Sequence, residues 1–151
     1  KILFKRGASY ERIKQWDLSD KDLLMSLQIN PKDPQVLNYL AYSWLERNYK
    51  LEKSMSMLNI AHRLKPNDPY IIDSIGWAYY LHGKFEIAEK YLKEAVILMP
   101  LDPIVNDHYA DILWKLNKNL QATYTWNYVL SLENLDEKMK KKIEKKVIFG
   151  I

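Results

Sequence analysis

The sequence predicts an all-α protein built as a stack of helical hairpins, and two observations carry that prediction. All six prolines fall in three copies of one turn, whose first prolines are Pro31, Pro66 and Pro100, 35 and 34 residues apart. Between the turns, apolar residues recur every three or four positions, the spacing that lines one face of a helix. A fixed period of this length indicates an array of two-helix repeats.

Each proline turn ends one helix and begins the next within four residues. The second proline of each pair follows an aspartate, at Asp33, Asp68 and Asp102. An aspartate at this place accepts hydrogen bonds from the free N–H groups of a helix start. A proline that follows it lacks an N–H that would be unpaired anyway. The first proline of each pair cannot continue the hydrogen-bond ladder of the preceding helix.

Small residues mark the places where the two helices of a hairpin approach closely. In the first helix they are Gly7, Ala41, Gly76 and Ala110, and in the second they are Ser19, Ser54, Ala88 and Ala122. Bulky side chains are expected to fill the space beside them: Leu40, Trp44, Ile75, Tyr79 and Leu113, facing Leu23, Leu58, Leu92 and Trp126. The fourth copy departs from the pattern at Val129 and Asn134, as terminal repeats commonly do.

These residues carry a family resemblance. The segment 73–80, together with 83–88, Ala95 and Pro100, resembles a tetratricopeptide repeat with every signature position occupied. The resemblance covers residues 1–134 and implies a right-handed superhelix of four hairpins, in repeats 1–33, 34–68, 69–102 and 103–134. The second repeat has one extra residue near 48–50, which we place in the turn between its helices. Since the chain opens at the second position of a repeat, we expect further helices upstream in the parent protein.

A narrower likeness concerns the segments 37–44 and 105–108. They resemble the carboxyl-terminal repeats of large bacterial tetratricopeptide proteins, several of which are lipoproteins of the cell envelope. Those lipoproteins act as adaptors, including for carboxyl-terminal processing proteases. The resemblance implies a bacterial adaptor with a periplasmic address.

Residues 135–151 are expected to form a capping helix and tail. Leu135, Met139, Ile143 and Val147 recur every four residues and make a narrow apolar stripe. An open stack exposes the apolar face of its last hairpin, and a helix with a polar back covers that face. Six lysines occupy the other positions: Lys138, Lys140, Lys141, Lys142, Lys145 and Lys146. A basic helix of this kind also fits a membrane surface or a nucleic acid, which we keep as the alternative.

In the family that the chain resembles, the first helix of each hairpin lines a concave groove that binds a peptide or partner protein. The repeat register places nine residues in that groove: Asn38, Tyr42, Leu45, Asp73, Trp77, Tyr80, Asp107, Asp111 and Trp114. The aromatics would anchor an apolar segment, and the aspartates would favour a basic one. Packing against a neighbouring hairpin and a merely solvated acidic face are the alternatives. Chaperone-binding members clamp a carboxylate with Lys, Arg and Asn here, and of these residues Asn38 alone matches.

The sequence gives little support to catalysis or metal binding as the function. There is no cysteine, and His62, His82 and His108 lie in different hairpins. No helical histidine pair with an intervening glutamate and no phosphate-binding glycine loop is present. Asp107, His108 and Asp111 form the one compact polar cluster, and a solvated face is favoured over a metal site there. We therefore expect neither catalysis, nor a metal, nor a cofactor.

Two further exclusions concern membranes and nucleic acids. No apolar run approaches the roughly 18 residues of a transmembrane segment. Helical hairpin repeats also occur in a family that reads single-stranded RNA. Aspartates along the groove would repel phosphates, so RNA binding is an alternative that we disfavour. The sequence thus predicts a non-catalytic scaffold for protein interaction.

Overall fold

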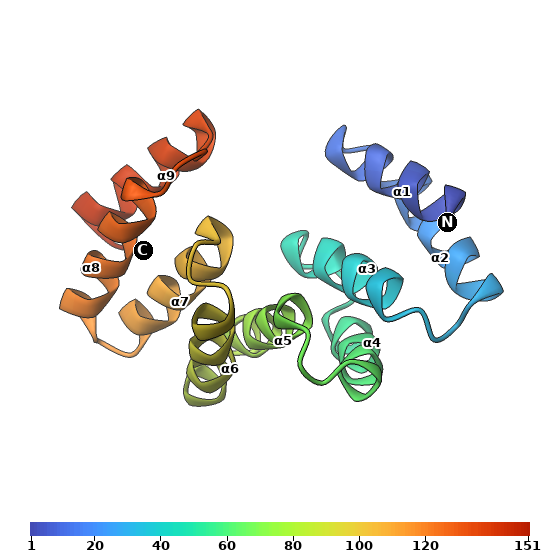
Figure 1. Ribbon diagram of the computed structural model, residues 1–151, viewed down its shortest axis with the longest axis horizontal. Coiled ribbons are helices and arrows are strands. Elements are labelled where there is room, and N and C mark those ends of the chain that lie inside the picture. The colour runs from blue at the N-terminus through green and yellow to red at the C-terminus, as the bar shows by residue number, and fades with distance from the viewer. The chain divides into compact units, whose positions relative to one another are not determined.

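The structure, a computed structural model, describes all residues 1–151 and contains nine α-helices and no strand. Four hairpins and a final helix account for them, as the repeat pattern predicts (Figure 1). The helices are α1 (Ile2–Arg12), α2 (Trp16–Ile29), α3 (Pro34–Glu46), α4 (Leu51–Leu64), α5 (Pro69–Leu81), α6 (Phe85–Leu98), α7 (Pro103–Lys115), α8 (Asn119–Ser131) and α9 (Glu137–Phe149).

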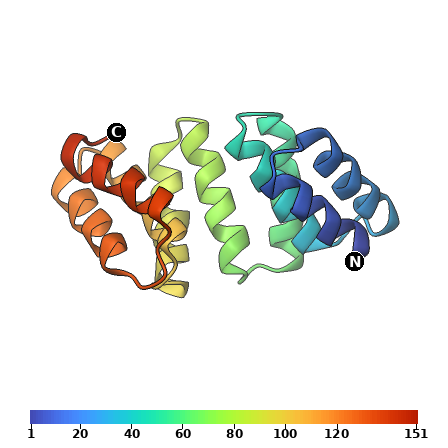
Figure 2. The same cartoon turned by 90° about the horizontal axis from the view of Figure 1, so that it is seen from above.

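The chain forms two compact units, Lys1–Ser74 and Ile75–Ile151, which we describe one at a time. In the first unit α1 pairs with α2 and α3 with α4. In the second unit α7 packs against α6 and α8, and α9 packs on α8. Figure 2 shows α8 and α9, in orange and red, lying side by side. None of the nine helices is both long and apolar enough to cross a membrane.

The aspartate–proline turns cap their helices as predicted. Asp33 accepts hydrogen bonds from the backbone N–H groups of Gln35 and Val36 at 3.0 and 3.2 Å. Asp68 and Asp102 make the same pair of bonds at the starts of α5 and α7. Helix α9, which has no proline at its start, is capped by Asp136, which accepts from the N–H of Met139 at 2.7 Å. Each cap satisfies donors that the helix itself leaves free.

Small residues hold the hairpins together at close range, also as predicted. A Cβ on Gly7 would lie 2.9 Å from Cγ of Leu23, and one on Gly76 would lie 2.7 Å from Cγ of Leu92. Both leucines are fully buried, as are Leu58 and Trp126 at the matching places. In these two hairpins the leucine therefore occupies the space that a side chain on the glycine would need.

The extra residue of the second repeat lies in the turn between α3 and α4. This turn has four residues, Arg47–Lys50, whereas the other hairpin turns have three. Asn48 and Lys50 adopt left-handed backbone angles, with φ of 52° and 47°. The guanidinium of Arg47 donates to Asp20 at 2.7 Å and lies 5.0 Å from the centre of the Trp16 ring. These contacts fasten the longer turn to α2.

The apolar stripe of α9 joins the core of the second unit. Ile143 is fully buried in a cluster with Leu113, Trp126 and Val129, and the other three members of the stripe pack against it. The helix thereby covers the apolar face of the α7–α8 hairpin, which would otherwise meet water.

Candidate functional site

The predicted groove residues fall in both units, and the second unit holds most of them. On α5, Trp77 and Tyr80 are three residues apart and stack with ring centres 4.5 Å apart. On its other side Trp77 stacks on His108 of α7, with centres 4.2 Å apart. The three rings thus form one stack contributed by the first helices of two successive hairpins, and His108 is its buried member. Trp77 and Tyr80 are half-buried, so part of each ring can still meet a partner.

The polar groups of this aromatic surface differ in how they are satisfied. Nε1 of Trp77 is buried and has no hydrogen-bond partner. A buried donor left unpaired is costly to the fold. Burial, followed by the negative charges of Asp111 and Asp107, raises the pKa of Tyr80 to about 12. The Tyr80 hydroxyl therefore stays protonated near neutral pH and can donate a hydrogen bond.

The two aspartates of α7 lie in an ion cluster with α9. Lys146 Nζ donates to Asp107 Oδ1 at 2.7 Å and to Asp111 Oδ1 and Oδ2 at 2.7 and 2.9 Å. Lys142 Nζ donates to Asp107 Oδ2 at 3.0 Å, and Trp126 Nε1 donates to Asp107 Oδ1 at 3.1 Å. We call these five residues the α7–α9 ion cluster. Asp107, Asp111 and Lys146 are 2%, 6% and 8% exposed.

The pKa values of the two carboxyl groups in the cluster are shifted in opposite directions. Burial by itself would raise the pKa of Asp107, but the charges of Lys146 and Lys142 outweigh burial and lower that pKa below its ordinary value. For Asp111, burial and the neighbouring charge of Asp107 prevail over Lys146 and raise the pKa to about 6. Two carboxylates that share one buried cation commonly separate in this way.

The last predicted groove residue of the second unit, Trp114, is covered by the end of α9. A Cβ on Gly150 would lie 2.1 Å from Cζ2 of Trp114, and Gly150 has a φ of 71°. A residue without a side chain is therefore required for the backbone to lie on the indole ring. The Trp114 ring also packs against Trp126, with centres 5.6 Å apart. Helix α9 and the residues that follow it thus contact three predicted groove residues, Asp107, Asp111 and Trp114.

This arrangement changes the electrostatic expectation from the sequence. Asp107 and Asp111 were expected to attract a basic partner at the end of the groove. In the structure the chain's own Lys146 and Lys142 neutralise them, and Lys146 fills the space between them. The cations that these carboxylates require are already supplied from within the second unit.

In the first unit, the four predicted groove residues differ in accessibility. Asn38 and Tyr42 are half-buried on α3, and Oδ1 of Asn38 is buried without a hydrogen-bond partner. Leu45 is 1% exposed and Asp73 is 5% exposed. Leu45 thus belongs to the buried core in this structure, and its side chain is not at the surface. Asn38 and Tyr42 are the two that present surface.

The role of Lys146 is the feature that sequence reasoning missed. It was counted among the lysines that face solvent, because it is one of six. A signal was present, since Lys146 follows Ile143 by three residues and Met139 by seven, which places it beside the buried stripe. A lysine at such a position needs a buried carboxylate, and Asp107 and Asp111 share a face of α7.

No group of three or more His, Asp or Glu side chains is placed to hold a metal ion. His108 lies against Trp77, while Asp107 and Asp111 are engaged by Lys146.

Sequence comparison finds similar proteins, one of which is named for the tetratricopeptide repeat. The chain is 32% identical over 99 residues to a TPR repeat-containing protein of Pseudomonas aeruginosa, which covers 66% of this chain and 17% of that protein. It is 30% identical over 88 residues to the lipoprotein NlpI homolog of Haemophilus influenzae, covering 58% of this chain and 27% of that one. The chain thus spans less than a third of these curated relatives. No family model matches it.

Solved structures share the fold at low sequence identity. A TPR protein of Thermus thermophilus superposes with a TM-score of 0.66 at 18% identity, over 97% of this chain and 98% of that one. The first TPR of Spaghetti (RPAP3), solved bound to an HSP90 peptide, gives a TM-score of 0.68 at 19% identity. That match covers 77% of this chain and 91% of the other.

Proposed function

Because the chain belongs to the tetratricopeptide repeat family, we propose that it serves as a non-catalytic module that binds a peptide or partner protein through the first helices of its hairpins. The observation that carries the proposal is the stacked pair Trp77 and Tyr80, both half-buried, with the buried ring of His108 against Trp77. Half-buried aromatic rings offer a large contact area at a low cost in side-chain entropy. The protonated Tyr80 hydroxyl adds a hydrogen-bond donor for a partner's carbonyl group.

The accessible groove residues indicate which chemical groups of a partner this surface favours. The ion cluster removes the free negative charge of Asp107 and Asp111, so this surface selects for apolar and hydrogen-bonding groups more than for cations. We propose that the primary contact is an apolar side chain of the partner against Trp77 and Tyr80. Asn38 and Tyr42 of the first unit are the proposed contacts there.

A bacterial adaptor is the proposed setting for this module. The supporting observations are the relatives in Pseudomonas aeruginosa and Haemophilus influenzae, the second of which is a lipoprotein homolog. A solved neighbour that holds a peptide supports a peptide as one kind of occupant. The alternative of a membrane-surface helix loses support because the apolar stripe of α9 is packed in the core of its unit.

The experiment is capture of partners from an envelope extract by the protein, compared between three forms: the unchanged protein and two double variants. Trp77→Ala with Tyr80→Ala should abolish capture while helix content by circular dichroism stays unchanged. The matched control is Tyr79→Ala with Tyr91→Ala, a pair that stacks elsewhere in the same unit with ring centres 5.6 Å apart. Capture that survives loss of Trp77 and Tyr80, or that fails equally in the control, would contradict the proposed site.

A further inference from the structure

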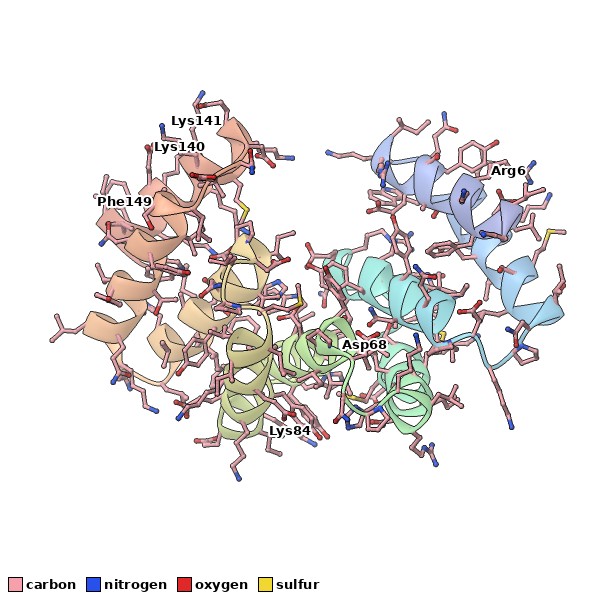
Figure 3. The ribbon with its side chains drawn as sticks, in the orientation of Figure 1. Arg6, Asp68, Lys84, Lys140, Lys141 and Phe149 are labelled. Atoms are coloured by element: carbon pink, nitrogen blue, oxygen red, sulfur yellow. The ribbon has the colours of Figure 1, made fainter.

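Helix α8 is the one helix of the nine that contains no Asp, Glu, Lys or Arg residue. Its neighbours differ, since α6 carries five such residues and Figure 3 labels Lys140 and Lys141 on α9. Part of α8 nevertheless faces solvent. Four exposed residues, spaced by four, three and four positions, form what we call the α8 row: Leu120, Tyr124, Asn127 and Ser131. Surface helices ordinarily carry charged residues on the face turned to solvent.

The α8 row departs from the pattern of the other hairpins. Leu120 is 89% exposed. At the matching position, the second helices of the other three hairpins have an acidic residue, namely Asp17, Glu52 and Glu86. Tyr124 is 78% exposed, and the residues that match it are Lys21, Ser56 and Lys90. Two large side chains with apolar surface thus stand where the repeat otherwise has charged or small polar ones, which is typical of a surface that another protein covers.

A groove of about 410 Å³ lies beside the row, lined by Tyr109, Leu113, Leu120, Gln121, Tyr124 and Thr125. It is open because two of its residues are smaller than their counterparts in the preceding repeat. There, Tyr79 and Tyr91 stack with ring centres 5.6 Å apart. Leu113 and Thr125 hold the matching positions and leave this space unfilled. The row and the groove together offer protruding side chains and a depression that can receive such side chains.

The polar side chains of α8 already donate hydrogen bonds within the helix. Thr125 Oγ1, Asn127 Nδ2 and Ser131 Oγ each donate to a backbone carbonyl of α8, at 2.8, 3.0 and 2.6 Å. A hydroxyl or amide that is bonded in this way does not need water when it is buried. The free energy lost by removing water from this face is therefore small.

These properties favour a second copy of the chain as the occupant. Around a two-fold axis the same surface lies on both sides, so charged residues near the axis meet charges of their own sign. In an antiparallel pair of α8 helices, Leu120 lies opposite Ser131 of the other copy and Tyr124 lies opposite Asn127, so a large side chain meets a smaller one each time. Two α6 helices paired in the same way would bring Lys90 against Lys93. A face without charge is thus what self-pairing requires, whereas a different partner could match charges with opposite ones.

Other ligands fit the α8 row less well. A nucleic acid or an anionic membrane binds through lysine and arginine, and α8 has neither. A helix that lies in a membrane surface buries a long apolar face, and the row offers only Leu120 and Tyr124 for that purpose.

We propose that two copies of the chain associate through the α8 row, with their α8 helices antiparallel around a two-fold axis between Tyr124 and Asn127. The helix is about 18 Å long, so the contact is smaller than the ~800 Å² per partner of a standard interface. The dimer is therefore weak, with a Kd on the order of 10–100 μM. This inference goes beyond the proposed function, since the α8 row includes neither Trp77 nor Tyr80.

The test is sedimentation of the full chain between about 5 and 500 μM, over which the average mass should rise from monomer toward dimer. Tyr124→Glu with Asn127→Glu should weaken association at least tenfold, because four glutamates would meet at the axis. Tyr124→Lys with Asn127→Lys should do the same, and it gives α8 the lysines that α6 has at the matching positions. An equal mixture of these two variants should associate again, since each glutamate then meets a lysine.

The matched control is Lys140→Gln with Lys141→Gln on α9. It changes the net charge by the same amount as the glutamate variant, at exposed positions outside the α8 row. Its Kd should stay within about threefold of the unchanged protein, and circular dichroism should show equal helix content in all variants.

Several outcomes would overturn the proposal. They are a protein that stays monomeric at the highest concentration, association that both charged variants leave intact, and a mixture of the two variants that does not associate. Binding of phosphatidylcholine vesicles that depends on Tyr124, in a chain that stays monomeric, would overturn it in favour of a membrane surface.

The same assay separates this inference from the proposed function. Trp77→Ala with Tyr80→Ala should self-associate like the unchanged protein, because neither residue belongs to the α8 row. If that variant no longer associates, the dimer forms through the aromatic surface and the α8 row is refuted. If it associates and still captures partners, the α8 row stands and the proposed site fails.

Discussion

Replacing Lys146 with methionine tests the ion cluster directly. The substitution removes the cation that lies between Asp107 and Asp111 and keeps a side chain of similar length. Asp107 keeps the ion pair with Lys142 and the hydrogen bond from Trp126. The loss therefore falls chiefly on Asp111, whose buried charge would be left without Lys146.

The structure sets an upper limit to the free energy of unfolding that the Lys146→Met variant can lose. The folded variant can avoid a bare charge by binding a proton at Asp111, whose pKa is already about 6 against an ordinary 3.8 and rises further without Lys146. Holding a carboxyl protonated costs about 1.36 kcal/mol for each pH unit above its unfolded pKa. From the ordinary value of 3.8, that cost is about 4.4 kcal/mol at pH 7 and about 1.6 kcal/mol at pH 5. The parent already carries part of this cost, because its Asp111 has a folded pKa of about 6. On the same reasoning the parent pays about 2.9 kcal/mol at pH 7 and about 1.6 kcal/mol at pH 5, so the variant loses at most about 1.4 kcal/mol more at pH 7 and almost nothing more at pH 5.

The sign of the pH dependence follows from the direction of the shift. A carboxyl with a raised folded pKa binds more protons in the folded state than in the unfolded state. Its contribution to stability is present below the unfolded pKa and is lost as the pH rises through the folded pKa. The variant should therefore lose more free energy of unfolding, relative to the parent, at pH 7 than at pH 5, by up to about 1.4 kcal/mol.

The measurement should report on the second unit alone, because the chain forms two compact units. Hydrogen exchange of α7 and α9 amides through a urea series, at pH 5 and at pH 7, gives the local free energy of unfolding. Lys145→Met is the matched control, since it removes an exposed lysine beside the cluster and should change stability by less than about 0.5 kcal/mol. A loss that is independent of pH, or one at pH 7 that is no larger than that of the control, would refute the reasoning.

Two glycines give further predictions. Gly150→Ala should lift the chain end off Trp114, because the new Cβ meets the indole at 2.1 Å, and the tryptophan fluorescence should shift to longer wavelength. Gly83→Ala is its control, with the same φ of 71° and nothing within 4 Å, and should cost about 1 kcal/mol of backbone strain without a fluorescence change. Gly76→Ala should destabilise the second unit by about 1–3 kcal/mol, measured by urea unfolding, because its Cβ would lie 2.7 Å from the Leu92 side chain. Adding Leu92→Ala should cost less in this variant than in the parent, and strictly additive losses would contradict the close contact.

The fold could be predicted almost completely from local chemistry. An aspartate followed by proline specifies a helix start by itself, and the caps at Asp33, Asp68 and Asp102 match the expectation bond by bond. Gly76 and Leu92 lie on the two helices of one repeat. A small residue on one helix and a bulky one on the other predict that these two helices approach closely there. The longer turn after α3 followed from a simple count of residues between prolines.

The site could be predicted only in part, because burial depends on what α9 covers. Register alone placed Asp107 and Asp111 on the binding face of α7, and it could not show that lysines 35 and 39 residues away from Asp107 would reach it. Leu45 illustrates the same limit, since a position that lines a groove in the family is 1% exposed in this chain. Trp77 and Tyr80 stack on each other within one helix, and their role in binding a partner stays a prediction.

The ion cluster also bears on which helices can occupy the end of the array. Helix α9 packs on α8 much as α7 packs on α6, so it takes the place of the first helix of a following hairpin. Any helix without a lysine at the place of Lys146 would leave two buried carboxylates without that cation. Such a mismatch opposes the open-ended association into filaments to which a repeat with an uncovered apolar end is prone. Asp107 and Asp111 thus favour α9 at this place over a helix that supplies no lysine.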